Sequence, residues 1–258
     1  MPAVEALTFD SRPQLAAPRT LLLAFSGWSD AGSAATNAVQ YVATQLGAQK
    51  FAAIEGEEFF DFTVQRPLVR LDDQQIRNLQ WPGWEFSATR NLAFLTGPEP
   101  HLRWRTFCGL VMRVIEELRI ERVALLGAFL AEVLYTDPVP LTGFASDPAF
   151  LERLKVSPTT YQGPTGVVGA LADAVRRVPL PIFSLWAAIP HYIAGTPNPR
   201  GTLALLLKLK EWMEDLPIDM APLEAAAANF QSQLLEAVEG NTELSNYIRG
   251  LKKGETSH

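Results

Sequence analysis

Short apolar runs alternate with amphipathic segments along the first 216 residues of the chain. Runs dense in Leu, Phe, Val and Ile that end near Gly or Pro predict buried strands, and apolar positions spaced at i, i+3, i+4 and i+7 predict helices. In residues 32–46, for example, Ala35, Ala38, Val39 and Val42 follow the helical spacing. The predicted strands are residues 20–26, 51–56, 91–96, 123–129 and 180–188, and the predicted helices are residues 32–46, 105–118, 148–154, 167–178 and 201–216.

This order of elements predicts an α/β fold, a three-layer α/β/α sandwich with a mainly parallel or mixed sheet. Residues 61–71 have extended character, but Pro67 confines them to an edge strand or an irregular arm. The composition changes after Pro217, where residues 219–239 and 241–251 predict two further helices. We therefore expect a core domain, residues 1–216, and a C-terminal helical appendage, residues 217–258, packed on the core or on a neighbouring subunit.

Composition and charge narrow the class of protein. Hydrophobic residues make up 48% and charged residues 19% of the 258 residues, a balance that excludes overall disorder. The single cysteine, Cys108, excludes an internal disulfide and suits a reducing cytoplasm. A net charge of −6 disfavours binding to nucleic acid or to an anionic membrane, and neither a secretory signal nor a membrane span is expected.

The turn between the first buried strand and the first helix is a candidate binding site. It contains Gly27, Ser29, Asp30 and Gly32, and free backbone N–H groups at a helix N-terminus can hold an anion. The spacing matches neither a P-loop nor a dinucleotide fingerprint, and Asp30 would repel a phosphate. The alternative is that Ser29 and Asp30 cap the helix and the glycines make the turn.

Ser29 also begins a candidate catalytic set. It lies in a Gly-x-Ser-x-Ala segment that resembles a nucleophile elbow, and the chain order Ser29, Asp137, His191 is that of α/β-hydrolases. We find no oxyanion segment of the HGGG type, and the elbow normally follows a later strand. The alternative for His191 is that it holds the following loop through backbone hydrogen bonds.

The carboxyl ends of the strands are expected to bring these residues together with a second turn. Residues 163–166 open a helix, and Gly163, Thr165 and Gly166 could contribute to a crevice for an anionic ligand together with His191, or Thr165 could simply cap the helix. No second histidine lies at ligand spacing from Glu57, Glu58 and Asp61, so no metal site is expected, and no cofactor either.

Four aromatic residues lie in segments of mixed polarity that look like loops. Buried, they would form a satellite core, and exposed, they would mark a protein interface. They are Trp81, Trp84, Phe86 and Trp104.

Five segments together resemble the proteasome-assembly-chaperone family in its bacterial, actinobacterial-like branch of uncharacterised proteins. They are GWSDAGSAA at 27–35, EFFDF at 58–62 with Arg66 and Pro67, GPEPHLRW at 97–104, YQGPTG at 161–166 and SLWAAIPHYIAGTPNP at 184–199. The resemblance spans residues 21–216. It implies a three-layer α/β/α domain related to phosphorylase and peptidase folds, appended C-terminal helices and an oligomer.

The resemblance also implies assembly work, because archaeal and eukaryotic members act as chaperones for proteasome subunits. Archaeal members that dock on the proteasome ring end in a hydrophobic residue, a tyrosine and one more residue, whereas this sequence ends in Gly254-Glu255-Thr256-Ser257-His258. Related bacterial proteins carry Pro-His-Thr-Arg-Pro where residues 134–138 read LYTDP, which removes a histidine and an arginine. Docking by the tail and any activity of that pair are therefore not expected here.

The sequence thus favours a non-enzymatic oligomer, a trimer or tetramer, that binds other proteins in the manner of an assembly chaperone. The rival hypothesis is a hydrolase, or an enzyme that binds a small anionic ligand, in the strand-end crevice around Ser29, Gly163 to Gly166 and His191.

Overall fold

The computed structural model describes residues 6–72, 76–193, 195–213 and 216–255. These residues form a nine-stranded sheet in the order β1-β3-β6-β7-β2-β8-β11-β9-β10 and a separate two-stranded sheet, β4-β5. The strands are β1 (Leu7–Phe9), β2 (Thr20–Ser26), β3 (Gln49–Glu55), β4 (Leu68–Leu71), β5 (Arg77–Gln80), β6 (Gly83–Thr89), β7 (Leu92–Pro98), β8 (Arg122–Ala131), β9 (Leu141–Ala145), β10 (Ser157–Pro158) and β11 (Ile182–Pro190).

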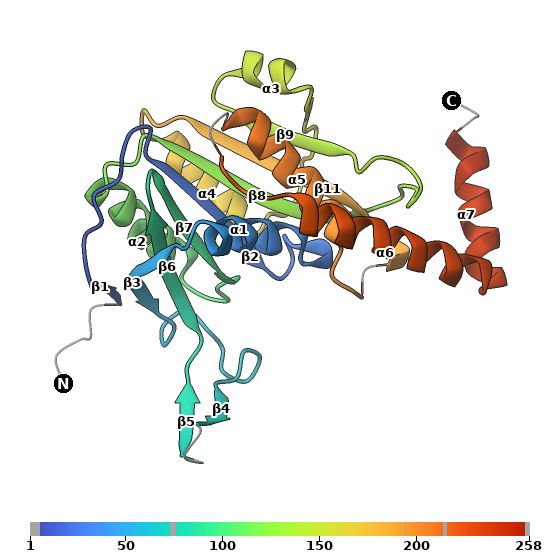
Figure 1. The fold of residues 1–258 in the computed structure, drawn as a ribbon. Helices are drawn as coiled ribbons and strands as arrows, with labels where there is room; N and C mark the ends of the chain where they lie inside the picture. Colours follow the sequence, from blue (N-terminus) through green and yellow to red (C-terminus); the bar gives the residue numbers. More distant parts are fainter. Residues whose placement is uncertain (1–5, 73–75, 194, 214–215, 256–258) are drawn as a thin grey trace.

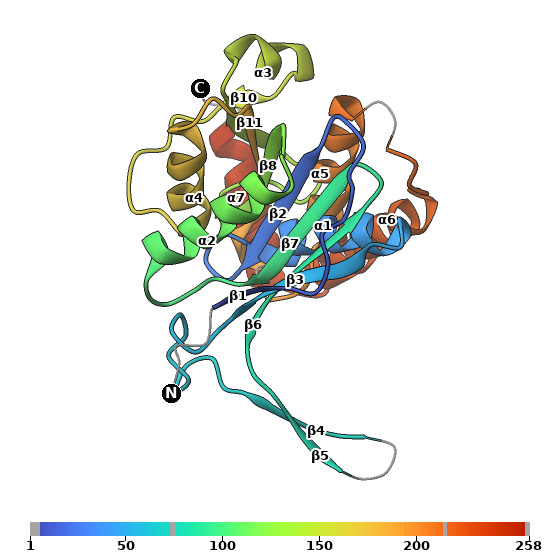
Figure 2. The same cartoon turned by 90° about the vertical axis from the view of Figure 1, so that its left-hand side faces the viewer.

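Helices cover both faces of the large sheet. They are α1 (Ala34–Gln45), α2 (Trp104–Glu117), α3 (Pro148–Leu154), α4 (Val167–Arg176), α5 (Pro199–Trp212), α6 (Ala221–Glu239) and α7 (Thr242–Glu255), with short 3-10 turns η1 (Ala31–Ser33) and η2 (His191–Ile193). Helices α2 and α4 lie on one face, and α1 and α5 lie on the other (Figures 1 and 2). The predicted three-layer α/β/α class and the C-terminal helices are confirmed.

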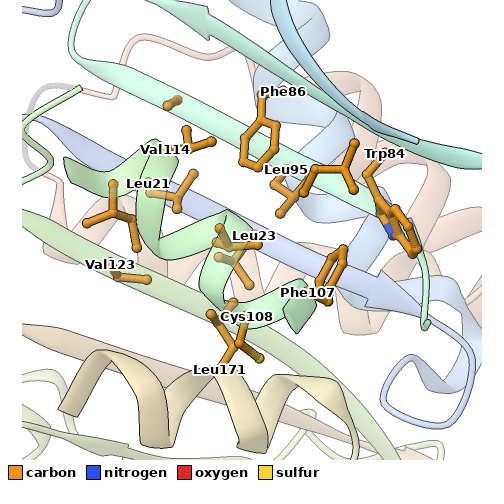
Figure 3. Packing of buried hydrophobic residues seen from close by; sticks show 14 of the residues in the cluster. Leu21, Leu23, Trp84, Phe86, Leu95, Phe107, Cys108, Val114, Val123 and Leu171 are labelled. Carbon is orange, nitrogen blue, oxygen red and sulfur yellow. The ribbon is translucent and has the colours of Figure 1, made fainter. Parts of the chain in front are cut away.

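The four central strands β7, β2, β8 and β11 are parallel, which explains why their sequences are continuously apolar. Alternate side chains of β2 enter two different cores: Leu21 and Leu23 pack under α2 and α4, whereas Leu22 and Ala24 pack under α1 and α5. Figure 3 shows the first of these cores, in which Leu21 and Leu23 belong to one cluster with Phe107 of α2 and Leu171 of α4. Both faces of the central strands are covered by hydrophobic clusters. Polar side chains can therefore be presented by the loops at the carboxyl ends of these strands.

Five strands were not predicted. Strands β1, β5, β6 and β10 are new, and β9 lies in the stretch after Asp137 that was expected to be irregular. Strand β6 interleaves Trp84, Phe86 and Ala88 with polar residues on its other face, an alternation that the tryptophans and Gly83 obscured. The aromatic residues divide as follows: Trp84 and Phe86 are buried, Trp104 is half-buried and Trp81 is exposed.

The two C-terminal helices, α6 and α7, contact the rest of the protein at two places. Helix α6 packs its Leu223 into the core under α1 and α5. Val238 of α6 and Ile248 of α7 pack against Leu134 and Tyr135, which follow β8. Asn241 caps α7 by accepting a hydrogen bond from the Leu244 N–H. The division of the chain at residue 216 stays a prediction.

Candidate functional site at the strand ends

Asp30 fixes the turn that follows β2. Its carboxylate accepts hydrogen bonds from the Ala35 N–H at 2.8 Å, the Thr36 N–H at 3.2 Å and the Thr36 hydroxyl at 2.5 Å, so it caps α1. Burial raises the pKa of the Asp30 carboxyl above its ordinary value, although the hydrogen bonds from Thr36 and Ala35 oppose that rise. The capping alternative is thus confirmed for Asp30, and its carboxylate is turned toward the helix rather than toward a ligand.

Ser29 is buried and does not cap the helix. Its backbone carbonyl accepts a hydrogen bond from the Ala128 N–H of β8, at 2.8 Å, which ties the turn to the neighbouring strand. Its hydroxyl has less than 1 Å² of accessible area and no hydrogen-bond partner among the described residues. The predicted nucleophile therefore lies beneath the surface with no base bonded to it.

His191 lies at the end of β11, but both of its ring nitrogens are engaged elsewhere. Nδ1 lies 3.2 Å from the carbonyl oxygen of Ala131, and Nε2 lies 3.1 Å from the hydroxyl of Tyr247 in α7. This contact arises because β11 and β8 are parallel partners that end together, with Pro190 beside Ala131. His191 thus has a structural role, but the groups it contacts through these two nitrogens are the end of β8 and the C-terminal helix α7 rather than the loop that was expected to follow it.

The predicted triad does not form in this structure. The Asp137 side chain accepts a hydrogen bond from the Thr136 hydroxyl at 3.0 Å, and the Asp137 carbonyl accepts one from Arg200 at 2.6 Å. The Ser29 hydroxyl has no hydrogen-bond partner among the described residues, and His191 bonds to Ala131 and Tyr247. The chain order predicted a catalytic set, but the His191 side chain contacts the Ala131 carbonyl at the end of β8 and the Tyr247 hydroxyl of α7 instead.

Glu99, which the sequence analysis did not select, lies at the centre of the strand-end region. It directly follows β7, and its Oε1 accepts a hydrogen bond from the Val167 N–H, the first residue of α4, at 2.6 Å. A carboxylate is favoured there because the first N–H groups of a helix lack partners within it. Glu99 thus caps α4, and Thr165, for which capping was the alternative to ligand binding, packs against Gly169. The signal available in the sequence was an acidic residue directly after a buried strand.

Gly166 allows Glu99 and Ser29 to converge. A Cβ atom at Gly166 would collide with Oε1 of Glu99 and would lie 2.7 Å from the hydroxyl oxygen of Ser29. Two predicted residues, Ser29 and Gly166, therefore do meet, over the N-terminus of α4. Gly163 lies further out in the same turn, where the Tyr161 hydroxyl donates to the carbonyl of Pro164 at 2.8 Å.

Gly32 serves a different contact. It has a φ of +59°, and its carbonyl accepts a hydrogen bond from the Asn198 N–H at 2.7 Å. A Cβ atom there would lie 2.8 Å from Cβ of Asn198, which itself caps α5 through the Gly201 N–H. Gly32 therefore joins the beginnings of α1 and α5. Gly27, with a φ of +119°, is placed beside Glu99.

Exposed apolar and aromatic side chains surround the same sheet edge. Trp28 follows β2, Leu130 is the second-last residue of β8, and Tyr161 precedes α4. Their exposed fractions are 60%, 49% and 62%. Within the described residues, no group of three or more His, Cys, Asp or Glu side chains could hold a metal ion. None of the described helices is long and apolar enough to cross a membrane.

Comparison with known proteins shows which family has this arrangement. The PAC2 family model matches residues 24–238. The chain belongs to the PAC2 family. No curated protein matches the sequence. A PAC2 family protein from Streptomyces avermitilis is 37% identical, with a TM-score of 0.81, and the match covers 89% of this chain and 99% of that one.

Two further comparisons extend from bacteria to archaea. A proteasome-assembly chaperone homologue from Mycobacterium tuberculosis is 35% identical, with a TM-score of 0.80 and coverage of 89% and 99%. PbaB from Pyrococcus furiosus, an archaeal proteasome activator, is 15% identical, with a TM-score of 0.69 and coverage of 90% and 98%, which shows a shared fold. The predicted resemblance to the proteasome-assembly-chaperone family is thereby confirmed, including its actinobacterial relatives.

Proposed function

We propose that this PAC2 protein is a homo-oligomeric, protein-binding factor that acts in the manner of an assembly chaperone and performs no chemistry of its own. The names of the Mycobacterium and Pyrococcus relatives, an assembly-chaperone homologue and a proteasome activator, support work on other proteins. The strand-end region supports it too, because no described residue acts as a base bonded to the Ser29 hydroxyl, and Glu99 already caps the N-terminus of α4.

The observation that carries this proposal is the β4–β5 hairpin with its flanks, residues 64–81, which we call the arm. Its described residues, 64–72 and 76–81, project away from the body of the protein in both views (Figures 1 and 2). Its exposed large side chains, each at least half accessible, are Val64, Leu68, Val69, Leu71, Ile76, Leu79 and Trp81. Contiguous exposed apolar side chains of this kind mark surfaces that bind another protein.

The proposal predicts that the purified chain is an oligomer in solution. Size-exclusion chromatography with multi-angle light scattering should give the mass of several chains, and a trimer or tetramer is expected. The measurement is made over a range of protein concentrations, because a subunit interface must dissociate on dilution. A clean monomer at every concentration, which also retains no protein from a lysate, would overturn the proposed function.

The rival hypothesis of a Ser29 hydrolase has its own test. We expect no labelling of the wild-type chain by a fluorophosphonate probe, because the Ser29 hydroxyl is buried and no base among the residues that the structure describes is bonded to it. Labelling that the Ser29→Ala variant abolishes would establish the hydrolase instead. An anionic ligand at α4 is also disfavoured, because two like charges 4 Å apart repel by about 4 kcal/mol at an effective dielectric constant of about 20, and Glu99 is already there.

A further inference from the structure

The arm has one apolar face and one mixed face. In the β4–β5 pairing, Val69 lies opposite Leu79 and Leu71 lies opposite Arg77. Directly paired residues and residues two apart share a face of a ribbon, so Val69, Leu71, Leu79 and Arg77 form one face, which we call the apolar arm face. The other face carries Leu68, Arg70, Asn78 and Gln80.

No described part of its own chain covers the apolar arm face. Val69, Leu71 and Leu79 are each at least half exposed, and among the described strands β4 and β5 pair only with each other. A two-stranded ribbon is at best marginally stable alone in water, because neither of its faces is packed. The arm therefore gains the stability of a packed element only when another surface covers it.

The arm leaves the body at the same sheet edge as the strand-end site. Strand β6 begins two residues after Trp81 and runs antiparallel to β7, with Glu85 opposite Thr96 near the end of β7. The beginning of β6 and the end of β7 are thus neighbours, and Glu99 follows that end. An arm from another copy that approaches this edge meets the strand-end site directly.

The strand-end site offers a complementary surface. It combines the exposed Trp28, Leu130 and Tyr161 with two carboxylates, Glu99 and Glu132, that form no salt bridge within the described residues. We call this surface the strand-end face. Glu99 uses one oxygen to cap α4, which leaves the other for a cation.

Charge favours a second copy of this chain as the partner. The arm sequence holds three arginines, Arg66, Arg70 and Arg77, against two aspartates, whereas the whole chain has a net charge of −6. Two arms that packed against each other would bring their arginines together, and like charges at an interface are unfavourable. An arm on the acidic strand-end face instead pairs opposite charges over apolar contacts.

We propose that the apolar arm face of one copy docks on the strand-end face of a second copy, with Val69, Leu71 and Leu79 against Trp28, Leu130 and Tyr161 and with Arg77 directed at Glu99 and Glu132. This docking rests on the proposed homo-oligomer and names its interface. The contact joins two different surfaces, so every copy both gives an arm and receives one, and the assembly closes when all arms are covered.

The experiment uses one variant on each side of the contact. The arm variant is Arg77→Glu with Leu79→Gln, and the face variant is Trp28→Ser. A matched control is Leu68→Gln, which changes an equally exposed leucine on the opposite face of the arm. All these side chains are exposed, so each variant should keep the wild-type unfolding temperature, which circular dichroism checks.

Light scattering then measures the mass of each variant and of a 1:1 mixture. The arm variant and the face variant should each dissociate at concentrations at least tenfold above that of the wild type, and Leu68→Gln should behave as the wild type. Mixing the two variants should restore a complex, because the intact arm of one meets the intact face of the other.

Each contrary result has a distinct meaning. If the wild type is an oligomer and the two variants remain oligomers, the docking is wrong and the proposed function survives. If only the arm variant dissociates and mixing restores nothing, the arms pair with each other. A monomeric wild type overturns the docking and the proposed oligomer together.

Discussion

Trp84→Ala is expected to lower the free energy of unfolding by about 4 kcal/mol, because truncation of a fully buried tryptophan removes its burial and leaves a cavity. Trp84 of β6 stacks on Phe60 with 4.5 Å between ring centroids and also contacts Phe59 and Phe107. Its indole N–H donates to the carbonyl of Pro98 at 2.7 Å, directly before Glu99. The side chain therefore supports both the core under α2 and the β7 end that places Glu99.

Urea unfolding followed by far-ultraviolet circular dichroism measures this loss. The matched control is Trp81→Ala, since Trp81 is exposed and contacts Phe62 with 5.0 Å between ring centroids. We expect the control to change the free energy of unfolding by less than about 1 kcal/mol. Equal losses in the two variants would contradict the assignment of Trp84 to the core.

The contrast between these two tryptophans shows which strands a local hydrophobic pattern predicts and which strands it misses. Continuous apolar runs predicted the central strands, and β2 begins and ends where the pattern placed it. Strand β6 was missed because its burial depends on its antiparallel partners β3 and β7, which a local pattern does not contain. The same limit applies to β5, whose only partner is β4.

The candidate site was predictable only in part for a similar reason. Asp30 as a cap and Gly166 at a turn follow from local chemistry, and both appear in the structure. Glu99 caps a helix that begins 68 residues later, so no local sequence motif predicts this cap. The set of Ser29, Asp137 and His191 failed because chain order does not fix which groups His191 meets, and a C-terminal residue, Tyr247, takes its Nε2.

Asp30→Ala is expected to lower the free energy of unfolding by about 3 kcal/mol. The change leaves the Ala35 N–H and the Thr36 N–H without their acceptor, and a buried donor left unpaired costs about 1–3 kcal/mol. Ala35 is fully buried, so water does not replace the lost acceptor. Urea unfolding measures the effect, and a loss below about 1 kcal/mol would show that the turn does not depend on this cap.

Asp30→Asn separates the charge of the cap from its hydrogen bonds, since the amide oxygen still accepts from the backbone. The folded-state pKa of Asp30 is raised by burial above the ordinary value of 3.8, so its ionisation opposes folding. We therefore compare the free energy of unfolding of the wild type with that of Asp30→Asn. The difference in favour of the wild type is fully present below pH 3.8 and decreases as the pH rises through the raised pKa of Asp30.

Asp61→Asn gives the opposite slope and serves as the control. Hydrogen bonds from the Thr63 hydroxyl and N–H lower the pKa of Asp61, so the wild-type advantage over that variant should be lost as the pH falls through the lowered pKa. Unfolding free energies from about pH 3 to about pH 7 measure both differences. Slopes of the same sign would show that the buried Asp30 carboxylate is held by its hydrogen bonds more strongly than it is penalised by burial.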